Sequence, residues 1–149
     1  MNKIKYILIA LAAVFFAASC EKAPQTSTAI VAEWHLIEMT GAQPSDLPSV
    51  YIDFKADLTF EIYQKVGEGR YRRYDGTYVV TENVVTGKYS DGEDWGSGYT
   101  ATFEEEILVL TADNGSGEVC RYEKASLDPA EKDKADVVTK ADESHPRFL

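Results

Sequence analysis

The feature that most constrains the fold is a series of short, apolar-rich runs separated by tight turns between residues 30 and 125. Within a run such as 58–66, apolar and polar residues alternate, which is typical of a strand with one face in a core and one in water. Turns such as 66–69 and 90–92 are rich in glycine and too short for parallel crossovers, which need a dozen or more residues. The runs are therefore predicted to form sequential antiparallel strands.

Nine runs fit this description: 30–39, 50–54, 58–66, 70–75, 77–81, 84–89, 99–103, 107–111 and 119–123. Asp75-Gly76 is interpreted as the turn between the fourth and fifth runs. An open meander of eight or nine strands would expose two sheet edges, and closure removes them. The predicted fold class is all-β, an antiparallel up-and-down β-barrel of eight or nine strands. A short weak helix or a disordered segment is expected after it.

The N-terminus has the pattern of an export signal. Lys3 and Lys5 precede an apolar stretch over residues 6–18, which suits the apolar region of a signal peptide and is short for a membrane span. Small residues then lead into Cys20, and the whole resembles a bacterial lipoprotein signal, in which this cysteine is lipidated. An ordinary secretory signal with a chance cysteine is the alternative.

These observations divide the chain into four parts. They are a signal peptide (1–19), a lipidated tether (20–29), the barrel (30–125) and a charged C-terminal tail (126–149). In the tail, Asp128 before Pro129, with Glu131 following, predicts the start of a short helix near 129–140.

Charge and cysteine content restrict the partners. The formal net charge is −10, and loss of the signal removes two lysines and no acid, so a nucleic-acid partner is excluded. The membrane partner is then reached through the lipid on Cys20, and we expect an exported protein anchored to the cell envelope, at the outer membrane. With Cys20 modified, Cys120 has no partner for a disulfide and is expected to be buried.

A family resemblance rests on several segments. Ala32-Glu33-Trp34 is similar to the Gly-x-Trp of lipocalins, with alanine in place of glycine. Together with 51–65, 74–78, 86–92 and 108–111, it resembles the lipocalin-like domain of small Gram-negative lipoproteins. The resemblance implies an all-β, antiparallel up-and-down eight-stranded β-barrel that is plugged at one end by Trp34 and whose mouth holds a small apolar ligand. It also implies an arginine over the plug, for which Arg121 is the candidate.

Alternation and the many tyrosines indicate which side chains would line such a ligand site. The candidates are Phe54, Phe60, Ile62, Arg73, Tyr78, Tyr99, Phe103, Leu108 and Tyr122. Arg73 would face the interior if Tyr71 does, and could then pair with a ligand carboxylate. If Tyr74 faces inward, Arg70 and Arg72 would point there instead, and a basic outer face is the remaining alternative. The leading hypothesis is that a small amphipathic or hydrophobic molecule binds in the barrel. The alternative is a solid barrel that serves as a protein-interaction or structural module, with Trp95 as the contact residue.

No catalytic residue, cofactor or metal site is predicted, and the protein is not expected to be an enzyme. The histidines, His35 and His145, are isolated, so a general base built on either would lack partners. The acids of 91–94 lack the full EF-hand pattern and are interpreted as a solvated turn.

Overall fold

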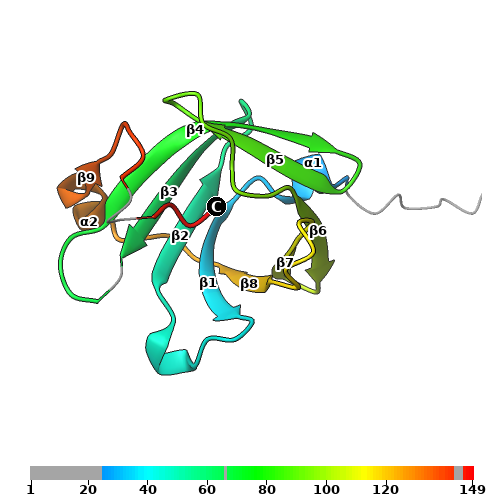
Figure 1. The fold of residues 1–149 in the computed structure, drawn as a ribbon, viewed down its shortest axis with the longest axis horizontal. Helices are drawn as coiled ribbons and strands as arrows, with labels where there is room; N and C mark the ends of the chain where they lie inside the picture. Colours follow the sequence, from blue (N-terminus) through cyan, green and yellow to red (C-terminus); the bar gives the residue numbers. More distant parts are fainter. Residues whose placement is uncertain (1–24, 66, 143–145) are drawn as a thin grey trace, which may run out of the picture.

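A computed structural model describes residues 25–65, 67–142 and 146–149. Eight strands surround a common core, and in Figure 1 they form a ring around the end of the chain. The strands are β1 (Glu33–Met39), β2 (Ser49–Phe54), β3 (Thr59–Lys65), β4 (Arg72–Thr81), β5 (Val84–Tyr89), β6 (Tyr99–Glu104), β7 (Ile107–Ala112) and β8 (Val119–Lys124). The remaining elements are α1 (Thr26–Ala29), the 3-10 turn η1 (Pro44–Asp46), α2 (Pro129–Lys134) and the short β9 (Asp136–Val137).

Each strand pairs antiparallel with the next, and β8 pairs antiparallel with β1. The predicted eight-stranded up-and-down barrel is therefore confirmed, and its β8–β1 pair removes both edges of the sheet. One seam is short, because β5 and β6 pair only at Val84↔Thr100 and Val85↔Tyr99. β9 lies outside the ring and pairs parallel with the start of β4.

The predicted alternation sets the two faces of the sheet. Phe60, Ile62 and Gln64 of β3 are all buried on the inner face, as expected. Leu58 was expected to share that face, and this is wrong. It is 48% exposed with φ 66°, because it belongs to the turn before β3 rather than to the strand. Cys120 is buried and free, as predicted, and burial raises the pKa of its thiol to about 12.

The predicted turn at Asp75-Gly76 is wrong, because the two runs form one strand, β4. Gly76 faces Phe60 of β3 and Tyr89 of β5, at the point where the strand passes from one neighbour to the other. A Cβ on Gly76 would lie 2.0 Å from the backbone oxygen of Lys88. Glycine is needed here because two strands approach each other closely. In the sequence, such a glycine looks the same as a glycine that is needed for a turn.

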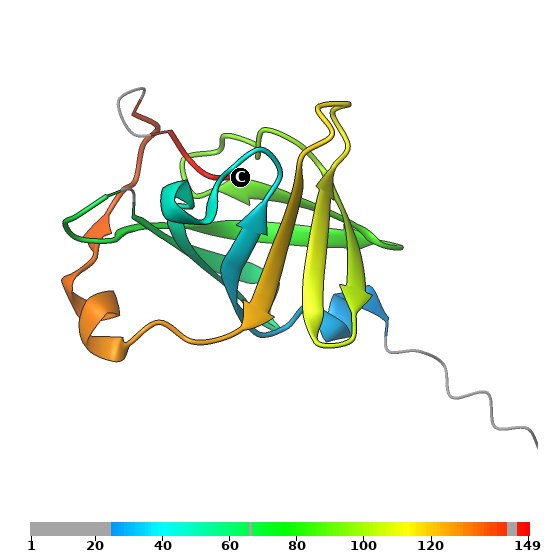
Figure 2. The ribbon, with the colours of Figure 1, turned by 90° about the horizontal axis from the view of Figure 1, so that it is seen from below.

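The two ends of the barrel are closed differently. In Figure 2, α1 lies at one end and the last residues of the chain lie at the other. At the α1 end, the Trp34 indole Nε1 donates to the Ile30 carbonyl (2.8 Å), and both residues are buried. We call the opposite end, where 90–98 and 146–149 meet, the mouth.

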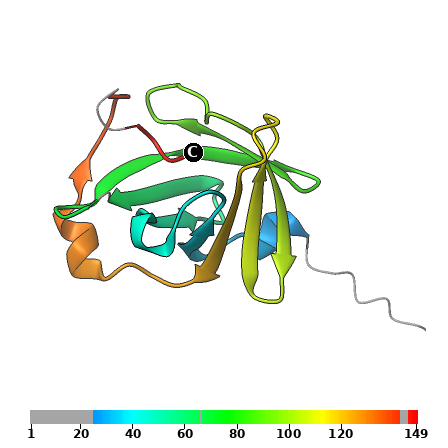
Figure 3. The ribbon, with the colours of Figure 1, turned by 60° about the horizontal axis from the view of Figure 1, so that its bottom comes forward.

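The tail is docked on the barrel over much of its length. α2 begins as predicted, with the Asp128 carboxylate accepting from the Ala130 amide (2.8 Å), but ends at Lys134 rather than near 140. It ends there because the next residues pair with β4 as β9. Figure 3 shows α2 on the outside of the barrel, remote from α1. Leu127 is buried beside Tyr63 and Tyr71 of the outer face, which holds the connection in place.

Candidate functional site

The barrel interior contains most of the predicted ligand-lining residues. Phe54, Phe60, Ile62, Tyr78, Tyr99, Leu108 and Tyr122 are all at most 5% exposed and belong to one core cluster. Phe103 is partly buried against the same cluster. These side chains pack on one another; the ring centroids of Phe54 and Tyr78, for example, are 5.0 Å apart. The interior is thus occupied by the protein's own rings, so the space for a ligand must be sought elsewhere.

Arg73 does not line the interior, and this prediction is wrong. Tyr74 takes the inward position and is 1% exposed, so its neighbour points outward. On the outer face, an Arg73 Nη2 lies 3.9 Å from Glu61 Oε1. The sequence allowed either Tyr71 or Tyr74 to face the interior, and in the structure Tyr74 faces the core.

Trp95 was expected in an exposed loop, and this is also wrong. It is 6% exposed and its ring lies 5.1 Å from Phe60 and 6.1 Å from Tyr99, centroid to centroid. The indole enters beside Gly87, whose missing side chain leaves the space that the ring fills. Trp95 is therefore a core residue supplied by the 90–98 loop, and it cannot serve as the contact residue of an interaction surface.

Trp34 lies at the closed end, where the plug was expected. The cation over its ring is Lys124, whose Nζ is 5.5 Å from the ring centroid. Arg121, the predicted partner, instead pairs with Glu104 and Glu38 on the outer face. The strand alternation explains the difference, since Lys124 shares a face of β8 with the buried Tyr122, and Arg121 takes the opposite face.

The mouth is covered by the segment 146–149. The Gln64 amide nitrogen donates to the Pro146 carbonyl (2.8 Å), and its amide oxygen accepts from the Phe148 backbone N–H (2.9 Å). The Tyr89 hydroxyl donates to the Leu149 oxygen (2.6 Å), and the Leu149 side chain is buried in the core cluster. This segment therefore closes the end opposite Trp34.

Arg147 provides the charged contact of the segment. Its guanidinium donates two hydrogen bonds to the Asp91 carboxylate and lies 4.1 Å from the Tyr89 ring centroid. The hydrogen bonds from Arg147 hold the pKa of Asp91 at about 2, below its ordinary value of 3.8. Burial raises the pKa of Tyr89, so its hydroxyl stays a donor throughout the physiological range.

The Asp91 pKa predicts how docking of 146–149 depends on pH. Because this carboxylate titrates at a lower pH when docked, its contribution is fully present above about pH 4 and is lost as the pH falls through about 2. We expect the Phe148 amide signal in NMR to keep its docked position at pH 5 and to lose it toward pH 2. In Asp91→Asn, the same signal should not show this transition; an unchanged transition there would assign it to another group.

Beside the segment lies an open groove of about 530 Å³. It combines an aromatic ring, an apolar side chain and charges of both signs. Its lining residues are Tyr89, Asp91, Glu93, Asp94, Lys140, Ala141, Arg147 and Leu149. Such a mixture of apolar surface with a few polar groups is typical of ligand sites.

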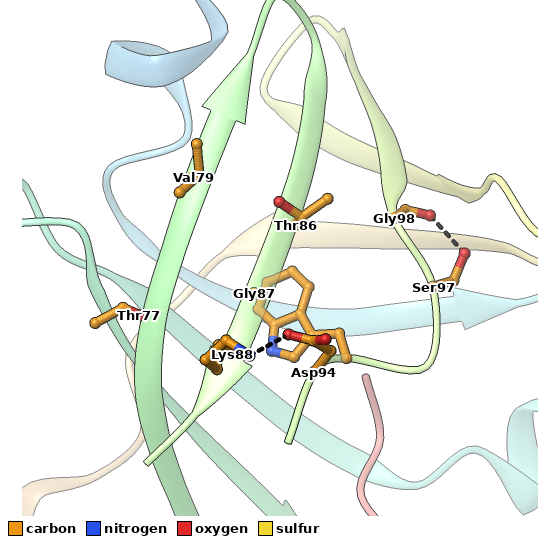
Figure 4. A pocket seen from close by; sticks show the side chains of 9 residues that line it. Thr77, Val79, Thr86, Gly87, Lys88, Asp94, Ser97 and Gly98 are labelled. Carbon is orange, nitrogen blue, oxygen red and sulfur yellow. Dashed lines mark hydrogen bonds and ion pairs between the residues drawn. The ribbon is translucent and has the colours of Figure 1, made fainter. Parts of the chain in front are cut away.

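A second groove, of about 430 Å³, lies over the outer face of β4 and β5 (Figure 4). Thr77 and Val79 of β4 and Thr86 of β5 line it, and an ion pair between Lys88 and Asp94 (2.7 Å) crosses its edge. Neither groove is lined by any of the nine predicted ligand-lining residues. Trp95 connects this second groove to the interior cluster, whereas Tyr89 and Leu149 both connect the mouth groove to it. The mouth groove is the better candidate site, because it is the larger and shares more of the cluster.

The described residues offer little for catalysis or metal binding. No group of three His, Cys, Asp or Glu side chains within them is arranged to hold a metal ion. Of the 91–94 acids, Asp91 pairs with Arg147 and Asp94 with Lys88, which agrees with a structural turn. His35 stacks on Tyr51, with 4.4 Å between ring centroids. His145 and Cys20 lie outside the described residues.

The sequence prediction missed Gln64, Tyr89, Asp91 and the 146–149 segment as parts of one site. One signal was present: Pro-Arg-Phe-Leu is an apolar ending with a single cation, after a tail of mostly charged residues. Its docking partner could not be read from the sequence, because Gln64 is 84 residues away from Phe148.

Comparison with known proteins agrees with the fold. A family model described as a lipocalin-like domain matches residues 30–110. No curated protein matches the chain. Within the part of the chain that the structure covers, no helix has the length and apolar character needed to cross a membrane.

Proposed function

The chain belongs to the lipocalin-like domain family, and on that premise we propose that it is a lipid-anchored binding protein of the cell envelope. Its ligand is a small amphipathic molecule held at the mouth of the barrel rather than deep inside it. The role is binding and not catalysis. The observation that carries this proposal is the groove of about 530 Å³ at the mouth, where Tyr89 and Leu149 lie beside charged groups.

The filled interior determines where the ligand would sit. Eight strands enclose a space that is just wide enough to be filled by side chains or to hold one small ligand. Here two tryptophans and several smaller rings take that space. An apolar chain of a ligand could then extend from the groove only as far as the Leu149 side chain permits, with its polar head near Glu93 and Lys140.

Titration with dodecylammonium and with dodecanoate, below their micelle concentrations, tests the proposal. The full chain carrying Cys20→Ser is titrated, and binding is measured by tryptophan fluorescence. We expect one saturable site with a dissociation constant on the order of micromolar. Glu93→Lys should shift the preference toward dodecanoate by about 10-fold, since it replaces an anion at the groove by a cation. Glu106→Lys makes the same charge change in the β6–β7 turn, at the closed end, and should leave the preference unchanged. Absence of saturation with both amphiphiles would refute a ligand site at the mouth.

The membrane attachment is proposed from Cys20 and has its own test. The net charge of −10 argues against docking on anionic headgroups through a basic patch, so several acyl chains on Cys20 would supply the stable anchor. We expect Cys20→Ser to abolish acylation, measured on the N-terminal peptide by mass spectrometry, and to move the protein from the outer-membrane fraction to the soluble fraction. Cys120→Ser should do neither. A Cys20→Ser protein that stays with the membrane would contradict the lipid anchor.

The packed interior also favours a second candidate, a solid barrel used as a structural or interaction module. Trp95 is not available for it, because the indole is buried. The two candidates differ in the amphiphile titration, which the solid module would leave without a saturable signal.

A further inference from the structure

The contacts that hold 146–149 are of a kind that any extended peptide could make. Gln64 bonds the carbonyl of Pro146 and the N–H of Phe148, both of them main-chain groups. Tyr89 bonds the main-chain oxygen of Leu149. We call Gln64, Tyr89, Asp91 and Tyr74 the peptide seat. Three of its hydrogen bonds depend on the peptide backbone and not on which side chains it carries.

Gln64 gives the strongest indication that the seat binds the main chain of an extended peptide. Among the described residues, it is the one polar side chain in the buried class, at 8% exposed. A buried amide needs partners for both its donor and its acceptor. Both partners come from 146–149, so an unoccupied seat would leave a polar group facing the core cluster without them.

The seat also selects side chains at two positions. The Arg147 guanidinium makes a bidentate contact with Asp91 and lies over the rings of Tyr89 (4.1 Å) and Tyr74 (5.7 Å). This combination of carboxylate and aromatic faces favours arginine over other residues. Two residues later, Leu149 fills an apolar position in the core cluster. The preferred ligand is thus an extended segment with arginine followed, two residues on, by a leucine-sized apolar residue.

The chain's own segment fits the seat imperfectly. Arg147 Nε is buried and finds no hydrogen-bond partner among the described residues. A buried donor without an acceptor weakens the docked state. This cost lowers the free energy needed to undock 146–149, so the seat can be vacated.

We propose that the peptide seat binds an extended arginine-containing segment of a partner protein, and that 146–149 is a built-in competitor for it. The inference rests on the proposed function, because it assigns a ligand class to the same mouth. The net charge of −10 favours a cationic partner segment at long range.

The test uses the full chain with Cys20→Ser in two forms. One has the natural ending, and the other carries Arg147→Glu and Leu149→Asp, which place an anion beside Asp91 and a charge in the apolar position. The probe is a fluorescein-labelled synthetic peptide containing Pro-Arg-Phe-Leu, and its control has glutamate in place of arginine. Binding is followed by fluorescence anisotropy, and near-UV circular dichroism verifies the fold of each variant.

We expect the substituted form to bind the arginine peptide at least about 10-fold more tightly than the natural form, because an attached segment competes at millimolar effective concentration. The glutamate peptide should bind at least about 10-fold more weakly. Adding Gln64→Leu or Asp91→Asn to the substituted form should weaken arginine-peptide binding by a similar factor, whereas adding Glu106→Lys should not.

Two results would overturn the inference: a folded substituted form that binds neither peptide, or one that binds both equally. The amphiphile titration is made on the form with unsubstituted 146–149, because Arg147 and Leu149 line the groove. If dodecylammonium or dodecanoate saturates that form, only the peptide assignment fails and the amphipathic site stands. If that form binds neither amphiphile and the substituted form binds no peptide, both proposals fail.

Discussion

Replacing Trp95 with alanine is expected to lower the free energy of unfolding by about 3–5 kcal/mol, the range for removing a large buried aromatic side chain. The indole is 6% exposed and packs on Phe54, Phe60 and Tyr99. Its loss would open a cavity between the mouth and the core. Denaturation in guanidinium chloride, compared with the unsubstituted protein, measures the change.

Trp95→Phe is the matched control. It keeps a ring in the same space and removes Nε1, a buried donor that has no partner among the described residues. We expect it to cost less than about 1.5 kcal/mol. An alanine variant within about 0.5 kcal/mol of the natural protein would mean that Trp95 behaves as a surface residue, which is what the interaction-module hypothesis required.

The second large effect is expected at Gly87, on β5. A Cβ there would lie 2.1 Å from Trp95 Cε2 and 2.4 Å from Cζ2, far inside van der Waals contact. Gly87→Ala must therefore displace the indole, at a cost of about 3 kcal/mol. The backbone is not the cause, since Gly87 is not among the glycines with positive φ.

A double-mutant cycle identifies the mechanism. In the Trp95→Ala background, Gly87→Ala should cost less than about 1 kcal/mol, because the new methyl group enters the space that the indole has left. Gly96→Ala is the control, since a Cβ there meets nothing within 4 Å and its φ is not positive; it should stay within about 0.5 kcal/mol. If Gly87→Ala lowered the free energy of unfolding equally in both backgrounds, the clash with Trp95 would not be the cause of the destabilisation.

These two positions also bear on function. Trp95 and Gly87 line the groove over β4 and β5, and the loop 90–98 that holds Trp95 also carries Asp91 to Arg147 at the mouth. A cavity made by Trp95→Ala could admit the apolar chain of an amphiphile that the natural barrel excludes. The amphiphile titration on this variant would then report tighter binding, although the protein is less stable.

Local pattern predicted the barrel well, for a physical reason. Residues that alternate along a strand must fall on opposite faces, so Phe60 and Ile62 were assigned to the core before any pairing was known. At Arg73 the pattern allowed two readings, one with Tyr71 facing the interior and one with Tyr74 facing it. The prediction of Arg73 as a ligand-lining residue followed the first reading, and the structure adopts the second. Asp75-Gly76 shows the same limit, because a glycine required by close strand packing looks like a glycine required by a turn.

The candidate site was much less predictable than the fold. The short β5–β6 pairing leaves room for the 90–98 loop, and that loop brings Trp95 inward and Asp91 to the mouth. Neither event has a local signature, because both depend on how two strands diverge. The family resemblance therefore suggested the proposed function, while the position of the candidate site came from the structure.

The sequence by itself determined the all-β class, the closed antiparallel meander, the burial of Cys120 and the start of α2, because each depends on alternation, turns or capping between nearby residues. Only the tertiary structure decided that Trp95 is core, that Arg73 lies on the outer face beside Glu61 and that 146–149 closes the mouth. These outcomes arise from contacts between distant segments. Such contacts are fixed by which side chains fill a shared space, and the order of residues along the chain does not encode that space directly.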